Sequence, residues 1–194
     1  MSFIIRRGDR IALDGINGCG KSSLLRIICG EHVGHEGTVC VGSNLKISYV
    51  NQDTSRLSGS LDDFIRARDI DGTLFKAILN QMDFERGQFE KNMEEFSGGQ
   101  KKKVLIASSL CDRANLYVWD EPLNFIDVYS RVQIERLILT YMPTMIFVEH
   151  DKAFRDRTAT EAGGGLNGQQ KTLPACAAER FLFMKIEKKN RGRN

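Results

Sequence analysis

Residues 15–22 combine glycine, lysine and serine at a spacing that suits the binding of a nucleotide phosphate. The segment is Gly-Ile-Asn-Gly-Cys-Gly-Lys-Ser and fits the pattern G-x-x-x-x-G-K-[ST]. Its glycines let backbone N–H groups approach phosphate oxygens where side chains would block them. Lys21 would place a positive charge on the β- and γ-phosphates, and the Ser22 hydroxyl would ligate Mg²⁺. The predicted nucleotide-binding residues are Gly15, Asn17, Gly18, Cys19, Gly20, Lys21, Ser22 and Ser23.

The segments on either side of this loop favour phosphate binding over a glycine-rich turn without function. Residues 10–14 form a strand candidate that leads into the loop, and residues 21–29 have the apolar spacing of a helix. A helix that begins near Lys21 points the positive end of its dipole at the same phosphates. Cys19 is interpreted as a small residue that contributes its backbone N–H, in preference to a redox role.

Two consecutive carboxylates, Asp120 and Glu121, follow the apolar run at residues 116–119. Asp120 would hold Mg²⁺ directly or through water, and Glu121 would polarise the attacking water as a general base. Taken alone, such a pair more often marks an ordinary end of a strand. The phosphate-binding pattern upstream is what favours the catalytic interpretation.

A third segment, Phe-Ser-Gly-Gly-Gln at residues 96–100, precedes a predicted helix. Ser97 and the two glycines after it could form a second anion-binding turn at a helix N-terminus, and the alternative is a capped helix start. Three lysines at residues 101–103 come next. We interpret them as a solvated helix face in preference to a contact with RNA phosphates.

The order of predicted elements indicates an α/β fold. Strands alternate with helices, which predicts a mostly parallel sheet with crossover helices and a small helical subdomain over about residues 53–96. The predicted strands cover residues 10–14, 38–41, 46–50, 116–119 and 144–148, and the predicted helices cover 21–29, 61–93 in several short pieces, 100–110 and 128–139.

Composition is that of one soluble globular domain. The chain has 194 residues, a net charge of +3, 41% hydrophobic and 27% charged residues. Five cysteines without a C-x-x-C pair indicate reduced thiols, not a disulfide framework or a zinc site. Because no apolar run approaches the ~18 residues of a membrane span, we expect a cytoplasmic protein without direct membrane insertion. Residues 162–194, which are rich in Gly, Gln and Lys, are predicted to be a disordered tail.

At this point the chain resembles the ABC ATPase superfamily, a group of P-loop NTPases, over residues 3–161. Six motifs follow one another in the family's order. They are Walker A (Gly15–Ser22), the Q-loop (Gln52), the signature (Ser97, Gly98, Gly99, Gln100), Walker B with its glutamate (Asp120, Glu121), the D-loop (Asp127) and the H-switch (His150).

The resemblance implies a role for each motif. Glu121, His150 and Gln52 are the implied catalytic residues, and Ser22, Gln52 and Asp120 are the implied Mg²⁺ ligands. The signature residues would contact the γ-phosphate of ATP that a different ABC domain holds, so a second ABC domain is an implied partner. The alternatives are a surface or capping histidine at residue 150 and an ordinary loop residue at 52.

Within the superfamily the chain is similar to the ABC-F group, which implies a ribosome or rRNA partner. The similarity lies in WDEPLNFIDVYSRVQIE at residues 119–135. Leu123 and Phe125 stand where ABC-F proteins usually have Thr and His, which resembles the second ATPase domain of the antibiotic-resistance, ribosome-protection branch. The rival functions are an ATP-binding subunit of a membrane transporter and a remnant with little or no ATPase activity.

An expected absence of the adenine-stacking strand, and of the first ATPase domain and linker that ABC-F proteins carry, motivates the remnant alternative. Members of the family carry, upstream of the segment that resembles residues 3–8, an aromatic that stacks on adenine. Phe3 aligns with a core residue instead. Base–aromatic stacking contributes roughly 1–3 kcal/mol, so we expect an N-terminally truncated domain with weakened adenine binding. The atypical end at residues 162–194 is either a lineage-specific tail or the product of a frameshift.

Overall fold

The computed structural model describes residues 2–35, 38–163 and 182–185. In chain order, the elements are β1 (Ser2–Ile5), β2 (Arg10–Leu13), α1 (Lys21–Ile28), β3 (Thr38–Cys40), β4 (Ile47–Val50), α2 (Leu61–Arg68), α3 (Gly72–Gln81), the 3₁₀ helices η1 (Arg86–Gln88) and η2 (Met93–Glu95), α4 (Gly98–Cys111), β5 (Leu116–Asp120), α5 (Val128–Tyr141), β6 (Met145–Val148), α6 (Lys152–Thr158), β7 (Glu161–Gly163) and β8 (Leu182–Lys185). The helices and strands predicted from the sequence are present, with small shifts at their ends.

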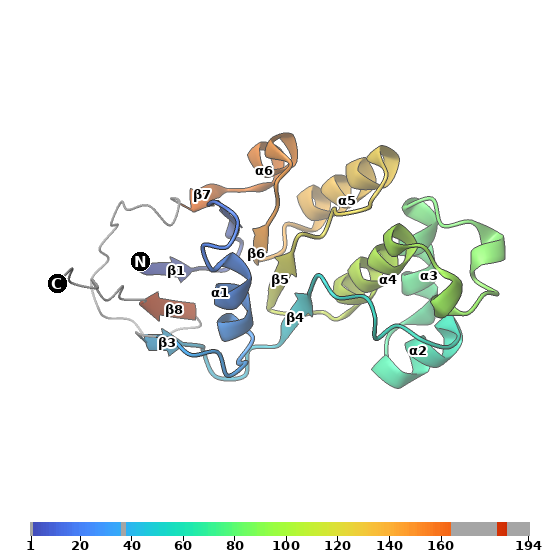
Figure 1. The fold of residues 1–194 in the computed structure, drawn as a ribbon, viewed down its shortest axis with the longest axis horizontal. Coiled ribbons are helices and arrows are strands. Elements are labelled where there is room, and N and C mark those ends of the chain that lie inside the picture. Colours follow the sequence, from blue (N-terminus) through green and yellow to red (C-terminus); the bar gives the residue numbers. More distant parts are fainter. Residues whose placement is uncertain (1, 36–37, 164–181, 186–194) are drawn as a thin grey trace.

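A five-stranded parallel sheet with the order β4-β5-β6-β2-β7 forms the centre of the fold (Figure 1). In its register Trp119 lies beside Val50, and Val148 lies beside both Asp120 and Leu13. Since all these strands run the same way, their carboxyl ends meet at one edge of the sheet. The loops after β2, β4, β5 and β6 are thereby brought together, and the predicted α/β fold with a parallel sheet is confirmed.

Both faces of this sheet are buried, as is usual for parallel sheets. Side chains of β2, β5 and β6 that point to one face pack with Leu24, Leu25 and Ile28 of α1. Side chains on the other face, including Trp119 and Phe147, join a larger core with residues of α4, α5 and the helical segments. Helix α1 therefore lies on the opposite face of the sheet from α4 and α5 (Figure 1).

Short helices occupy the segment between β4 and α4. The side chains of Ser60 and Asp71 accept hydrogen bonds from the first-turn amides of α2 and α3, which explains where these two helices begin. Helix α3 packs against α4, with Phe75 and Leu79 fully buried between them. None of the helices in the described parts of the chain is long and apolar enough to cross a membrane.

Strand β1 and helix α6 were not predicted, and two further strands were not expected. Strand β8 pairs antiparallel with β1 and β3 in a separate three-stranded sheet, and β7 pairs parallel with β2. Both strands include residues of 162–194, so the prediction of a disordered tail is wrong for them. The run Leu-Phe-Met at 182–184 is a strand signal that the surrounding polar composition obscured. The rest of that range lies outside the described residues.

Candidate nucleotide-binding and hydrolysis site

The predicted phosphate-binding loop connects the carboxyl end of β2 to the first turn of α1. Gly18 and Gly20 have φ angles of 77° and 98°, in the left-handed region that side chains disfavour. Gly20 is also the residue that caps α1, and it has no side chain to satisfy the first amides of the helix. These amides are therefore available to an anion that approaches the N-terminus of α1.

Lys21 lies over this loop and is 7% exposed. Its Nζ donates to the carbonyl oxygens of Gly15, at 2.8 Å, and Ile16, at 3.2 Å. The loop carbonyls thus hold the ammonium group at the mouth of the loop. A phosphate oxygen would be a stronger acceptor for this charged donor than either carbonyl, because both partners would then carry charge.

Asp120 ends β5 in the middle of the sheet and is 2% exposed. Burial raises the pKa of its carboxyl group, and the neighbouring Glu121 raises it further, whereas Ser22, Lys102 and Gln52 lower it. Its Oδ1 is buried without a hydrogen-bond partner among the described residues. A buried carboxylate oxygen needs compensation from a donor or a cation, and Ser22, Gln52 and Asp120 offer the oxygen ligands that Mg²⁺ prefers. The residues present therefore fit the predicted Mg²⁺.

Glu121, the proposed general base, contacts two other polar side chains at this edge. Its Oε2 accepts a hydrogen bond from Asn124 Nδ2 at 2.5 Å, and its Oε1 lies 3.3 Å from Nε2 of His150. Its φ angle of 48° is rare for a residue with a side chain and directs the chain sharply out of the strand. The structure thereby brings Glu121 and His150 together, although 29 residues separate them.

Glu149 supports this arrangement and was missed by the sequence reasoning. It is 4% exposed, and its Oε1 accepts from the amides of His150 at 2.7 Å and Asp151 at 3.2 Å. Its Oε2 accepts from the amide of Leu123 at 3.1 Å. One buried carboxylate therefore joins the loop after β5 to the loop after β6. The sequence signal that could have identified Glu149 is its position, as an acidic residue directly after the apolar strand at 145–148.

The signature segment forms a capped helix start, which is one of the two interpretations that the sequence allowed. Ser97 Oγ accepts from the amide of Gln100 at 3.2 Å, and Gln100 Oε1 accepts from the amide of Ser97 at 2.8 Å. This capping does not exclude anion binding, since the other backbone amides of the turn are still free to donate to an anion. Helix α4, which the signature begins, and helix α1, which follows the phosphate-binding loop, cover opposite faces of the sheet.

Two of the three lysines after the signature are buried, so the prediction of a solvated helix face is wrong for them. Lys102 and Lys103 are 2% and 7% exposed. Nζ of Lys103 lies 2.8 Å from Oδ2 of Asp127, and Nζ of Lys102 donates to the carbonyl of Asn51 at 2.9 Å. Helix α4 is covered by both the sheet and the short helices, which leaves it only a narrow solvent-facing side.

Asp127 caps α5 and connects it to α4. Its Oδ1 accepts from the amide of Ser130 at 2.8 Å, and its Oδ2 contacts Lys103. Burial alone would raise the pKa of this carboxyl group, but Lys103 and Ser130 outweigh that effect and hold the pKa well below its usual range.

Leu123 and Phe125, which depart from the usual ABC-F pattern, differ in their exposure to solvent. Leu123 is 1% exposed, and Phe125 is 85% exposed.

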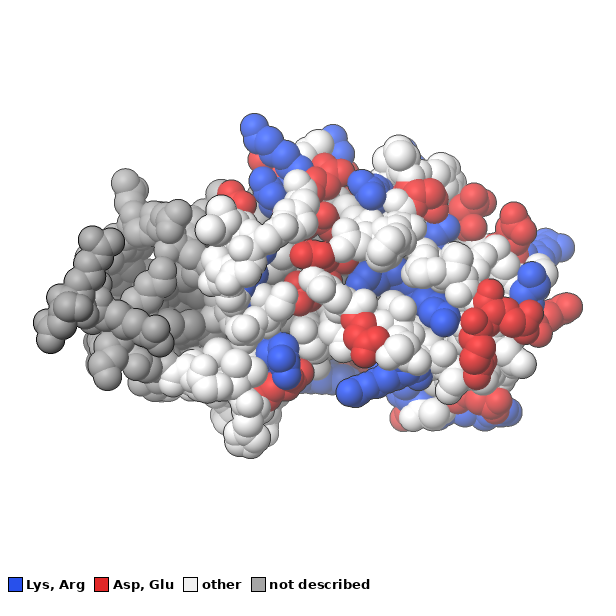
Figure 2. Space-filling model, viewed as in Figure 1, with Lys and Arg blue, Asp and Glu red and all other residues white. Residues whose placement is uncertain are grey.

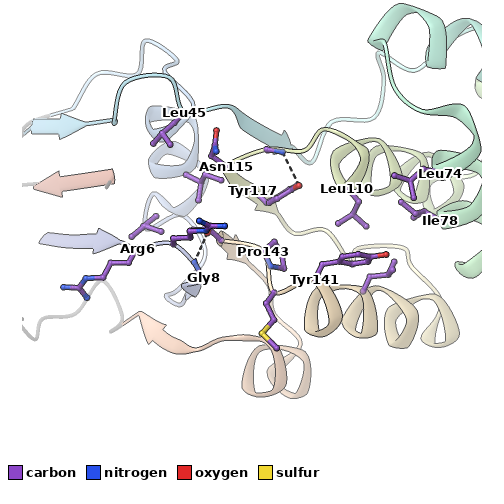
Figure 3. Close-up of a pocket in the computed structure, with 17 residues that line it drawn as sticks. Arg6, Gly8, Leu45, Leu74, Ile78, Leu110, Asn115, Tyr117, Tyr141 and Pro143 are labelled. Atoms are coloured by element: carbon purple, nitrogen blue, oxygen red, sulfur yellow. Dashed lines mark hydrogen bonds between the residues drawn. The ribbon is translucent and has the colours of Figure 1, made fainter. Parts of the chain in front are cut away.

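A separate cavity of about 840 Å³ lies at the other edge of the sheet, beside the first residues of β5 and β6 (Figure 3). Leu110, Tyr117, Tyr141 and Pro143 are among its lining residues. None of the residues that the sequence predicted for the nucleotide site lines it. The cavity is therefore separate from the carboxyl edge of the sheet, where the predicted site residues lie.

The fold and the arrangement of these motifs define a P-loop ATPase domain. A family model described as ABC transporter matches residues 1–124, and the chain belongs to this family of ABC-type ATP-binding domains. The ATP-binding protein Uup of Buchnera aphidicola subsp. Acyrthosiphon pisum is 35% identical over 169 residues, which are 81% of this chain and 28% of that protein. The chain thus spans less than a third of this relative's length.

Solved structures agree on the fold. The archaeal ribosome recycling factor aABCE1, in a crystal structure of its complex with the ribosomal stalk protein aP1, is 26% identical and matches with a TM-score of 0.66. The match covers 80% of this chain and 31% of that chain. An ATP-binding subunit of an ABC transporter, 20% identical, matches with a TM-score of 0.68 over 81% of this chain and 74% of its own. At that identity the second likeness shows the fold alone.

The signature glycines give a first testable prediction. A Cβ atom on Gly99 would lie 2.4 Å from the backbone oxygen of Phe125, whereas one on Gly98 would be 3.8 Å from its nearest neighbours in the Phe125 ring. We expect Gly99→Ala to lower the free energy of unfolding by about 1–3 kcal/mol, because backbone must move to admit the methyl group. Urea denaturation would measure this, with Gly98→Ala as the matched control. Equal effects of the two substitutions would contradict the prediction.

The Lys103–Asp127 pair gives a second prediction, for Lys103→Met. Since half of the Asp127 side chain is exposed, we expect a loss of about 1 kcal/mol or less at pH 7. The folded pKa of Asp127 is lowered, so the pair stabilises the fold above the unfolded value of about 4, and this contribution disappears as the pH falls through the folded pKa.

The difference in unfolding free energy between the unmutated chain and Lys103→Met should therefore shrink on acidification. Urea denaturation at pH 7, 4 and 2 would show it, because most of the contribution is lost only as the pH approaches the lowered folded pKa. Lys101→Met, which changes a partly exposed lysine of the same helix, is the control. A difference that stays constant over this range would show that the ion pair does not account for the stabilisation.

Proposed function

We propose that this chain binds Mg²⁺–ATP at the carboxyl edge of its parallel sheet and hydrolyses the bond between the β- and γ-phosphates when a second ABC domain completes the site. The convergence at Asp120 carries this proposal. A buried carboxylate oxygen without a partner lies beside Ser22 and Gln52, and the next residue, Glu121, contacts His150. Membership of the ABC-type ATP-binding family supports the choice of nucleotide.

Each residue of this edge has a role in the proposed reaction. Nζ of Lys21 leaves the carbonyls of Gly15 and Ile16 to bind phosphate oxygens, together with the loop amides. Ser22, Gln52 and Asp120 would hold Mg²⁺, which when bound neutralises charge on the phosphate oxygens.

Glu121 orients the attacking water and accepts its proton. Asn124 holds one oxygen of this carboxylate and leaves the other directed at His150, whose half-exposed ring would contact the γ-phosphate.

A second ABC domain is required in this proposal because of where the signature lies. Ser97–Gln100 begins a helix on the face of the sheet opposite to α1, which supports a contact with ATP that another domain would hold. Two domains arranged head to tail would each supply the missing half of the other's site. The isolated chain is accordingly expected to be a poor ATPase.

The broader role that we propose is that of an ABC-F type, ribosome-associated protein. The relative named Uup is an ATP-binding protein, and the solved structure at 26% identity belongs to a ribosome recycling factor. These likenesses favour a ribosomal partner over a transporter subunit. A role in antibiotic resistance is a narrower proposal that rests on Leu123 and Phe125. On the face shown in Figure 2, Lys and Arg side chains are interspersed with Asp and Glu. The proposed RNA contact therefore does not rest on a broad basic surface of this face.

Substitution of the proposed general base tests the enzymatic function. At protein concentrations at which two copies of the chain pair and complete the site, we expect Glu121→Gln to lower ATP hydrolysis by about 10²-fold or more, because the amide cannot accept the proton of the attacking water. ATP binding should persist, since Glu121 is not among the proposed phosphate or metal ligands. Phosphate release and binding of a fluorescent ATP would be measured, with Glu90→Gln, an exposed glutamate in the turn between η1 and η2, as the control. Background rates for both the unmutated chain and Glu121→Gln would instead support the remnant alternative.

The ribosomal partner requires a separate test. The Glu121→Gln chain, incubated with ATP, should sediment with purified ribosomes through a sucrose cushion, and should do so less with ADP, because only the triphosphate would bring two domains together. Recovery with membrane vesicles and not with ribosomes would overturn the ABC-F proposal and favour the transporter alternative.

A further inference from the structure

Lys102 is a buried cation that the proposed reaction does not use. It lies in the second turn of α4 and is 2% exposed. Its Nζ donates at 2.9 Å to the carbonyl of Asn51, the first residue after β4. Asn51 immediately precedes Gln52, a proposed ligand of Mg²⁺. One hydrogen bond therefore joins the signature helix to the backbone that carries this ligand.

The surroundings of Lys102 explain how an ammonium group is tolerated there. Burial lowers its pKa, whereas the carboxylates of Asp120, Glu121 and Glu149 act in the opposite direction. A buried charge is costly unless hydrogen bonds and opposite charges compensate it. Here the Asn51 carbonyl accepts a hydrogen bond, and the three carboxylates supply a favourable field without forming a direct ion pair among the described residues. Lys102 therefore belongs to the proposed catalytic edge, although it is on a helix whose first residues face another site.

Rigid secondary structure connects the two ends of this contact. Ser97 and Gln100 begin α4 through their reciprocal capping bonds, and Lys102 follows on the same unbroken helix. At the other end, β4 is paired along its length with β5, the strand that carries Asp120. A shift of α4 would therefore move the Asn51 carbonyl relative to Asp120, and with it the position of Gln52.

We propose that Lys102 is a positioning residue that holds the Asn51 carbonyl and thereby keeps Gln52 beside Asp120, coupling the Mg²⁺ site of one domain to its own signature helix. This inference rests on the proposed function. It assigns to Lys102 no contact with ATP and no part in proton transfer. Its effect is on the geometry of a metal ligand, one step removed from the metal.

A purely electrostatic role makes the opposite prediction. If Lys102 acted only through its charge, the apolar Lys102→Met would leave three carboxylates less neutralised, and a divalent cation would bind more tightly. If Lys102 positions Gln52, the same substitution releases the Asn51 carbonyl and a divalent cation binds more weakly. The sign of the change separates the two roles.

Binding of Mn²⁺, used as a paramagnetic probe for the Mg²⁺ site, can be measured on the full chain with a non-hydrolysable ATP analogue. The free Mn²⁺ signal in electron paramagnetic resonance gives the dissociation constant without any turnover. We expect Lys102→Met to weaken Mn²⁺ binding about tenfold, in the range seen when a group that orients a metal ligand is removed. Lys102→Arg, which retains a charged donor, should bind Mn²⁺ more tightly than Lys102→Met, and Lys101→Met should match the unmutated chain.

Unchanged or tighter Mn²⁺ binding by Lys102→Met would overturn the inference and leave the proposed function standing. Equal weakening in Lys101→Met would also overturn it, because the effect would then belong to the helix as a whole. If the unmutated chain failed to bind the analogue with Mn²⁺, the proposed function and this inference would fall together. Thermal unfolding would verify that each variant is folded, and Lys102→Gln would replace Lys102→Met if the latter did not fold.

Discussion

Burial of a carboxylate at the end of the middle strands is the constraint on which the site depends. Asp120 lies between β4 and β6 where the parallel sheet ends, and its Oδ1 has no hydrogen-bond partner among the described residues. Such a group is costly in an apolar interior unless a cation or donors approach it. The neighbouring elements supply these approaches: Ser22 from α1, Gln52 after β4, and the ammonium of Lys102 from α4. The parallel register brings them together, because it aligns the carboxyl ends of β2, β4, β5 and β6.

The parts of this site that the sequence predicted are those in which chemistry and spacing are local. A loop that needs left-handed glycines at positions 18 and 20 and a lysine directly after them leaves a recognisable pattern, and the apolar strand before Asp120 does the same. Family resemblance then added the residues that a local pattern does not mark, such as Gln52 and His150. The fold class followed from the alternation of strands and helices, since parallel strands need such crossovers.

The errors came from residues whose environment depends on distant segments. Lys102 and Lys103 look like a solvated face because charged residues in a row usually are, but α4 is enclosed by the sheet and by the short helices. Glu149 looks like the end of a strand, yet its carboxylate accepts amide hydrogen bonds from two loops. Strand β8 has its partners at β1 and β3, at the other end of the sequence, so local composition could not predict its pairing.

The same edge of the molecule also explains why a second domain is part of the proposal. The phosphate-binding loop and the signature lie with helices on opposite faces of the sheet, so closure of both over one nucleotide would require a large rearrangement of the core. Supply of the signature by another domain avoids that cost. Exposed apolar side chains in these loops and at the start of α5 agree with such a partner: Ile16 is 78% exposed, Phe125 is 85% exposed and Val128 is 76% exposed. Phe125 has a left-handed backbone, and its carbonyl oxygen lies where a Cβ atom on Gly99 would be, so the signature and the loop that carries this exposed ring are in close contact. Docking of a second domain at these loops would bury the Phe125 ring and contact the start of α4, the helix whose Lys102 donates to the carbonyl of Asn51.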